Sequence, residues 1–156
     1  RDLLYTIGSL QLAGGNFNEA AENFSEILKH HGMYRETLYL YGKSLLGQGR
    51  EEEVNRLLEG FAHFKPEENI NLVLLHAELL EKDDMVEAQR LLQSLVDTNE
   101  LTPLKAATLH MKLGCYHELL GNHQQAYHHF SKSVQLFPAN KAAKREMQRI
   151  ESLLTQ

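Results

Sequence analysis

The segment LYLYGKSLLGQGREEEVNRLL, residues 38–58, has a counterpart 34 residues earlier in the chain and another 34 residues later. Each of the three contains a residue pair, and an alanine or valine follows the second member of the pair after twelve positions. The pairs are Ile7-Gly8, Tyr41-Gly42 and Leu75-His76, and the residues that follow them are Ala20, Val54 and Ala88. A fixed period of this length predicts a chain that repeats one structural unit.

A fourth copy keeps the same internal spacing, with Leu113-Gly114 and Ala126, but begins four residues late. The delay coincides with the stretch from Asp97 to Pro103, which contains the turn-forming residues expected of a loop. We therefore expect a lengthened loop before the fourth copy.

Within a copy, apolar residues recur three or four positions apart, which is typical of one face of an α-helix. In the second copy Leu38, Tyr41 and Leu45 would share a face of a first helix, and Val54 and Leu58 a face of a second. No apolar–polar alternation of the kind found in strands competes with this pattern. The chain is predicted to be all-helical.

The period and its residues resemble the tetratricopeptide repeat (TPR), a helix–turn–helix unit with the pattern W-x2-L-G-x2-Y, A-x3-F and P. The second copy fills the first two motifs with Leu38, Tyr41, Gly42, Leu45, Val54 and Leu58. The turn glycine of the family is matched by Gly15, Gly49 and Gly121, with Asp83 in the third copy. The resemblance implies an all-α, right-handed superhelix (solenoid) of four helix–turn–helix repeats.

The resemblance also divides the chain. It implies TPR 1 at residues 1–34, TPR 2 at 35–68, TPR 3 with the lengthened loop at 69–102, and TPR 4 at 103–139. A solenoid needs an atypical last element to cover its final repeat, and residues 140–156 are predicted to be that C-terminal capping helix. His76 stands where the other copies have a small residue, so we expect looser packing inside the third repeat.

Composition excludes several classes of function. The 156 residues have a formal net charge of −5, which gives no basic surface for nucleic acid. No apolar run approaches the length of a membrane span, and no signal-peptide pattern precedes the first repeat. A single cysteine, Cys115, excludes an internal disulfide and is typical of a reducing compartment. We expect an intracellular protein, cytoplasmic or nuclear, whose targeting signals would lie outside this fragment.

No residues are arranged for catalysis. Paired carboxylates such as Asp83-Asp84 lie at turns or helix starts, where the helix dipole favours acidic side chains. Cys115 and His117 are two residues apart on one helix, so their side chains diverge by about 200° and cannot form a nucleophile–base pair. The chain is predicted to be no enzyme and to hold no cofactor.

Five of the nine histidines fall in the fourth repeat: His110, His117, His123, His128 and His129. His110 and His117 occupy aromatic positions of the repeat and are expected to pack as flat rings. The other three are expected to be exposed. Their spacing reproduces no metal motif, so no metal is predicted, and a pH-sensitive contact stays an alternative.

The first helices of TPR arrays line a concave surface, and the positions just beyond the core stripe would form its groove. We expect a mainly apolar groove that binds a partner, because it holds residue types enriched at interfaces. The alternative is that these residues only pack between neighbouring repeats. The predicted groove residues are Tyr5, Ser9, Leu12, Tyr39, Lys43, Leu46, Val73, Ala77, Leu80, Met111, Cys115 and Glu118.

Co-chaperones of the TPR family hold the terminal carboxylate of heat-shock chaperones with lysine, arginine and asparagine side chains. The matching positions here are Tyr5 and Ser9, then Lys43, then Val73 and Ala77. Only Lys43 is a cation, so no bidentate carboxylate clamp can form. Chaperone binding of this kind is therefore disfavoured.

The resemblance implies a non-catalytic scaffold or adaptor that binds a peptide or helical segment of another protein in the groove. The alternative is self-association, or a structural segment of a larger TPR solenoid within a multiprotein complex. In that case the first repeat would dock onto another copy or onto neighbouring repeats. A regulatory subunit of an enzyme complex has the same sequence features as the first hypothesis.

Overall fold

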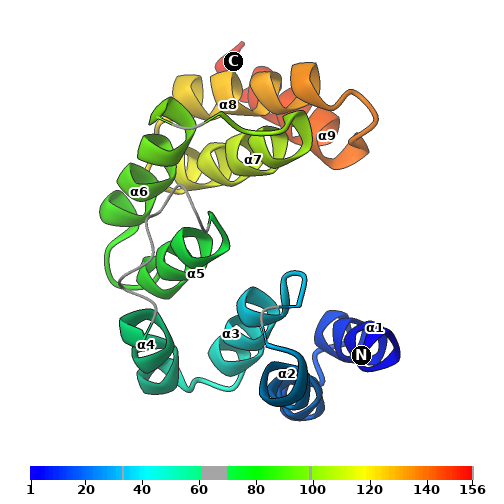
Figure 1. The fold of residues 1–156 in the computed structure, drawn as a ribbon. Coiled ribbons are helices and arrows are strands. Elements are labelled where there is room, and N and C mark those ends of the chain that lie inside the picture. Colours follow the sequence, from blue (N-terminus) through cyan, green and yellow to red (C-terminus); the bar gives the residue numbers. More distant parts are fainter. Residues whose placement is uncertain (33, 61–69, 99, 156) are drawn as a thin grey trace. The chain divides into compact units, whose positions relative to one another are not determined.

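The computed structural model describes residues 1–32, 34–60, 70–98 and 100–155, which form nine α-helices and no β-strand (Figure 1). The prediction of an all-α fold is confirmed. The helices are α1 (Asp2–Ala13), α2 (Phe17–His31), α3 (Thr37–Gly47), α4 (Glu51–Gly60), α5 (Ile70–Leu80), α6 (Met85–Thr98), α7 (Pro103–Leu119), α8 (His123–Leu136) and α9 (Lys141–Leu154).

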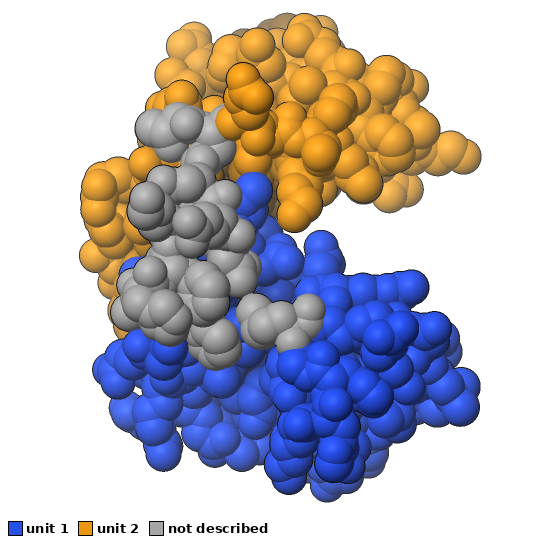
Figure 2. Space-filling model, in the orientation of Figure 1, with its two compact units in different colours: residues 1–79 blue, residues 80–156 orange. Residues whose placement is uncertain are grey.

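The chain forms two compact units, Arg1–Leu79 and Leu80–Gln156 (Figure 2). Unit 1 holds α1 to α4 and all of α5 except its last residue, and unit 2 holds α6 to α9. The predicted boundary between the second and third repeats, at residues 68 and 69, lies outside the described residues. The repeat boundaries stay predictions. Among the described helices, none has the length and apolar composition needed to cross a membrane.

The core of unit 1 consists of the positions that the period singles out. Ala20, Phe24 and Ile27 of α2 are fully buried and pack against apolar residues of α1 and α3. A second cluster joins Leu45 of α3, Val54 of α4 and Leu75 of α5, with at most 1% of each exposed. Burial of side chains at helical spacing supplies the hydrophobic stabilisation that holds these short helices together.

Small residues allow the helices to approach closely. A Cβ atom added at Gly8 would lie 2.9 Å from Cε1 of Phe24, and one at Gly114 would lie 2.5 Å from Cε1 of Phe130. A Cβ at Gly42 would overlap the side chain of Leu75. These glycines therefore permit the close approach of the helices.

Three turns between paired helices share one conformation. Gly15, Gly49 and Gly121 have φ of 81°, 74° and 84°, in the left-handed region that glycine adopts without strain. In each turn the N–H of the residue after the glycine donates to a carbonyl oxygen five residues earlier. These bonds are Asn16 to Gln11 (2.8 Å), Arg50 to Leu45 (2.9 Å) and Asn122 to His117 (2.8 Å).

The turn between α5 and α6 is one residue tighter. The Asp84 N–H donates to the Leu80 carbonyl, only four residues earlier, at 2.8 Å. Asp83 does not have a positive φ, so its predicted role as a substitute for the turn glycine is wrong. An aspartate avoids the left-handed strain because the shorter turn does not require it.

The tighter turn moves α5 by one residue relative to the expected alignment. Counted from the carbonyl that closes the turn, Ala77 corresponds to Gly8, Gly42 and Gly114. Ala77 is fully buried, whereas His76 is exposed. The small residue of the third repeat is therefore Ala77. The expectation of looser packing around His76 rested on an incorrect register.

The four extra residues before the fourth repeat lie in a helix. The connection from α6 to α7 spans residues 99–102, which is no longer than the connection at residues 32–36. Helix α7 has 17 residues, compared with 12 in α1 and 11 in α3. Thr102 caps its first turn by accepting a hydrogen bond from the Lys105 N–H, and Pro103 suits the first helical position. The predicted lengthened loop is wrong.

Helix α9 covers the end of unit 2. Ala143 and Ile150 of α9 are fully buried, and Ile150 forms a cluster with Ala126 and Phe130 of α8. Asn140 caps the helix by accepting from the Ala143 N–H at 3.3 Å. The helix therefore packs along one side, while Leu153 near its end stays 43% exposed; its role as a cap stays a prediction.

Replacing Ala126 by leucine tests the close packing of α8. The added carbons have no space beside Phe130 and Ile150, and overpacking costs about 1 to 3 kcal/mol of stability. A thermal melt followed by circular dichroism should show Tm lowered by several degrees. The exposed neighbour Gln125 serves as the control, since Gln125→Leu should leave Tm nearly unchanged. Equal melts for the two variants would contradict the packing described for α8.

The cap can be tested with two substitutions in α9. Ile150→Ala removes a fully buried side chain and should cost about 2 to 5 kcal/mol. Leu153→Ala changes a side chain that is 43% exposed and should have a much smaller effect. Chemical denaturation of both variants measures the difference. If Ile150→Ala were no more destabilising than Leu153→Ala, α9 would not serve as a cap.

Candidate functional site

Two tyrosines meet at the start of unit 1. Tyr5 of α1 contacts Tyr34, in the connection between α2 and α3, edge to face with ring centres 5.7 Å apart. Tyr5 also packs against the buried Phe24, with ring centres 6.2 Å apart. Burial, with a smaller contribution from the Glu36 carboxylate, raises the pKa of Tyr5. The ring therefore stays protonated and is anchored by the core beneath it.

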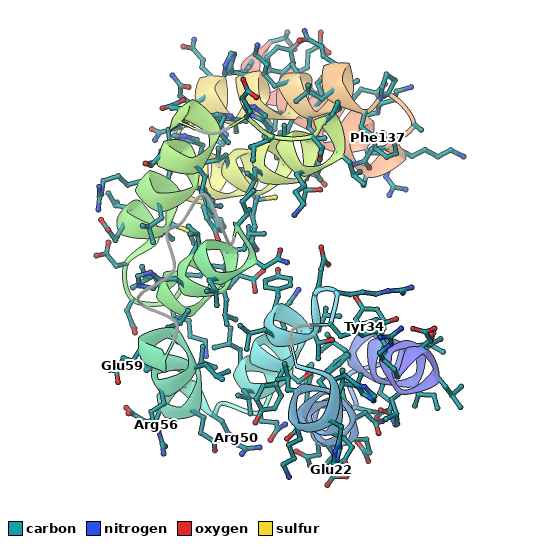
Figure 3. The ribbon with its side chains drawn as sticks, in the orientation of Figure 1. Glu22, Tyr34, Arg50, Arg56, Glu59 and Phe137 are labelled. Atoms are coloured by element: carbon teal, nitrogen blue, oxygen red, sulfur yellow. The ribbon has the colours of Figure 1, made fainter. Side chains whose placement is uncertain are left out.

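Two guanidinium groups lie over these rings. The Cζ atom of Arg35 is 5.3 Å from the centre of the Tyr5 ring and 5.2 Å from that of Tyr34, and Cζ of Arg1 is 4.6 Å from Tyr34. These are cation–π distances. The Tyr34 hydroxyl donates to the carboxylate of Asp2. We call Arg1, Tyr5, Tyr34 and Arg35 the tyrosine–arginine cluster; Tyr34 is labelled in Figure 3.

Arg35 has an unusual backbone. Its φ of 48° is the only positive value among the described residues that are not glycine. A left-handed conformation is strained for a side chain of this size, and such strain is often found at binding sites. No described carboxylate forms an ion pair with Arg35, whose charge meets the faces of two tyrosines. The guanidinium is exposed and retains its hydrogen-bonding edge for another molecule.

A second polar contact joins α3 to α5. The Tyr39 hydroxyl donates to Oε1 of Glu78 at 2.6 Å, and Nζ of Lys43 lies 3.9 Å from the same oxygen. The Lys43 ammonium is also 5.6 Å from the centre of the Tyr39 ring. The Glu78 side chain is only 8% exposed, so its carboxylate is largely withdrawn from water. Lys43 is therefore partly neutralised and is weaker than Arg35 as a free cation.

Unit 2 repeats this combination of residue types. Oε1 of Glu81 accepts from the Tyr116 hydroxyl at 2.6 Å and from Nζ of Lys112 at 3.1 Å. The Lys112 ammonium lies 5.6 Å from the Tyr116 ring centre. Two residues beyond Tyr116 on α7, the Glu118 carboxylate binds Arg149 of α9 with an N–O distance of 2.5 Å. Glutamates thus orient Lys112 and Arg149 in this unit.

The structure distributes the predicted groove residues over different environments. Leu12 and Leu46 pack against the core clusters of unit 1, and Met111 and Cys115 against that of unit 2. Burial raises the pKa of the Cys115 thiol, which makes it a poor nucleophile. The half-buried members are Tyr5, Ser9, Leu12, Tyr39, Lys43, Leu46, Val73, Leu80, Met111, Cys115 and Glu118.

One predicted groove residue, Ala77, is fully buried and is inaccessible to a partner. The one-residue shift of α5 explains this. At the positions predicted to line the groove, the shift replaces Ala77 by Glu78 and Leu80 by Glu81. Tyr34 and Arg35 were not among the predicted residues, because they lie in a connection outside the repeat motif. Their only signal in the sequence is an aromatic and a cationic residue side by side in a predicted loop.

Comparison with solved protein structures identifies the fold. No family model matches the chain, and no curated protein sequence matches it. A thermophilic TPR protein of Thermus thermophilus, TTC0263, superposes with a TM-score of 0.75 at 16% identity, covering 98% of this chain and 80% of that one. Two structures of the MamA protein have TM-scores of 0.60 and 0.61 at 20% identity; they cover 97% and 94% of this chain and 80% and 83% of theirs. The chain has the tetratricopeptide-repeat fold.

Within this TPR fold, unit 2 contains three stacked imidazole rings. His110 and His117 come from α7 and His129 from α8, and all three are at most 9% exposed. The His129 ring centre is 5.2 Å from each of the other two, with interplanar angles of 27° to His110 and 6° to His117. His110 and His117 do pack as flat rings, but the expectation that His129 is exposed is wrong. We call these residues the histidine stack.

The histidine stack carries one internal hydrogen bond. Nδ1 of His110 and Nδ1 of His129 are 2.9 Å apart, so one of them donates and the other accepts. Nδ1 of His117 is buried without a hydrogen-bond partner. Among the described residues, no three histidine, cysteine or acidic side chains are placed to hold a metal ion. The stacked rings pack α7 against α8 within unit 2.

Proposed function

We propose that this TPR chain is a non-catalytic interaction module that binds a peptide or helical segment of another protein. The binding surface would lie on α1, the α2–α3 connection and α3 of unit 1. The tyrosine–arginine cluster carries this proposal, because it combines accessible aromatic rings with a cation that has no carboxylate partner among the described residues. The TPR fold, which is shared with the solved structures above, supports it.

Tyrosine and arginine are the residue types that most often dominate binding energy at protein interfaces. Tyr5 and Tyr34 are rigid because each contacts another aromatic ring, so a partner that packs on them has little side-chain entropy to lose. Arg35 can donate to a carboxylate or carbonyl of the partner while it stays over the two rings. We therefore propose a partner segment with an acceptor group beside an apolar side chain.

The apolar groove of the sequence analysis needs modification. Tyr39 and Lys43 remain candidates on α3, but they face the Glu78 carboxylate. Leu12 and Leu46 contribute to the cores of the repeats. We propose an aromatic and polar surface in which the leucines only support the tyrosines.

Arg35→Asn separates binding from stability. Asparagine tolerates a left-handed backbone better than arginine, so the Tm of the variant should equal or exceed that of the parent. Loss of the guanidinium should weaken partner binding by about 30-fold, the effect of losing an interface anchor of about 2 kcal/mol. The partner segment would be recovered by affinity capture and mass spectrometry, and its affinity measured by titration calorimetry.

Arg56→Gln on α4 makes the same change in net charge at another exposed arginine and is the control (Figure 3). It should bind as the parent does. A folded Arg35→Asn protein with parental affinity would place the binding surface elsewhere.

Self-association is the second candidate function, and one observation favours it. Leu3, Ile7 and Leu10 lie along one face of α1 and are 72%, 37% and 69% exposed. The corresponding residues of α7 are Leu109, Leu113 and Tyr116, all at most 3% exposed. Contact with another copy would bury the α1 residues in the same way.

Light scattering over a range of protein concentrations tests this alternative. If α1 mediates self-association, the mean molecular mass of the parent should rise with protein concentration. The mean mass of the Leu3→Gln/Leu10→Gln variant should stay at the value of a monomer. Both substituted side chains are exposed, so the variant should remain folded. A monomeric parent at millimolar concentration would exclude self-association through α1.

A further inference from the structure

The His110–His129 contact can hold one shared proton but not two. When both rings are neutral, one Nδ1 carries hydrogen and the other offers a lone pair across 2.9 Å. A further proton on the acceptor nitrogen would turn it into a second donor that faces the first. The hydrogen bond would be lost, and a buried ring would become charged.

The surroundings of the pair add to this cost. Lys132 and His128 of α8 are the nearby basic groups, and His117 of α7 stacks on His129 from the same helix as His110. Asp97 of α6 is the one carboxylate that favours the charged form of either ring. Burial, followed by the basic neighbours, lowers the pKa of His110 and brings that of His129 to about 4. Burial also lowers the pKa of His117.

We propose that the histidine stack is an acid-sensitive latch, which joins α7 to α8 at neutral pH and releases their packing under acidic conditions. The release would loosen unit 2 by itself. In unit 1 the described histidines, His30, His31 and His76, are all exposed and form no buried contact of this kind.

The latch lies where its opening affects a buried cluster of unit 2. His129 precedes Phe130, whose ring fills the space beside Gly114 of α7 and contacts Ile150 of the cap. Ser133, one turn further along α8, donates to the Ala107 carbonyl of α7 at 2.8 Å. Separation of the rings would therefore withdraw α8 from both α7 and α9, and would expose the apolar surface that the cap covers.

The direction of the pH effect follows from proton binding. An unfolded histidine titrates near pH 6.5 and the folded His129 near 4, so between these values the unfolded chain binds more protons than the folded one. The contribution of His129 to the free energy of unfolding is fully present above about pH 6.5 and decreases as the pH drops toward 4. Below pH 4 the protonation of His129 changes the stability no further.

The test compares the full chain with His110→Phe/His129→Phe. The double substitution replaces both polar partners by apolar rings of similar shape, which leaves no unpaired donor. Between pH 7.5 and pH 4.5 the parent should lose about 10 °C more in Tm than the double variant. His123→Phe changes an exposed histidine of the same helix and should keep the parental loss. Equal losses in the parent and the double variant would overturn the proposal.

Nuclear magnetic resonance of the parent supplies a test that needs no variant. The imidazole nitrogens of His129 should remain neutral to about pH 4. As the pH falls, amide signals of α7 and α8 should broaden or shift before those of α1 to α3. Titration of His129 near 6.5 in the folded protein, or simultaneous loss of signals in both units, would contradict the latch.

Discussion

Close approach of helices at one small-residue position is the constraint on which the rest of this structure depends. Where glycine occupies it, at residues 8, 42 and 114, even one added carbon would overlap Phe24, Leu75 or Phe130. The spacing of the helices determines which side chains become core and which remain accessible. The buried aromatic rings, the tyrosine–arginine cluster above Phe24 and the histidine stack beside Phe130 all follow from that spacing.

Cations over tyrosine rings recur through the molecule, but their partners differ. Lys43 and Lys112 each combine a ring with a glutamate, and that glutamate also accepts from the tyrosine hydroxyl. Such three-membered contacts orient the side chains and satisfy their charge. Arg35 lies over the rings of Tyr5 and Tyr34, but no described glutamate forms an ion pair with it. A hydrogen-bond acceptor of another molecule would therefore bind more favourably to Arg35, in the connection between α2 and α3, than to Lys43 or Lys112.

The sequence was sufficient for the all-α fold, because Ala20, Val54, Ala88 and Ala126 keep the same place within each copy, twelve positions after its residue pair, and are all buried. It could not predict the turn before Asp84, since apolar periodicity does not distinguish a hydrogen bond that spans four residues from one that spans five. Burial of His129 depends on His110, 19 residues away, across a helix pair. Of the candidate site, the tyrosines of the first helices could be anticipated from the repeat. Tyr34 and Arg35 could not, because no period governs a connection.

The one-residue shift of α5 has a consequence for how the surface of a repeat protein can diversify. Adjacent residues on a helix point about 100° apart, so a shift of one position brings a different set of side chains to every exposed site of that helix at once. Here the shift puts Glu78 and Glu81 where the regular spacing would put Ala77 and Leu80. The loss of one codon in a turn, offset by the gain of one in the preceding connection, can therefore turn an apolar helix face into an acidic one without a single amino-acid substitution.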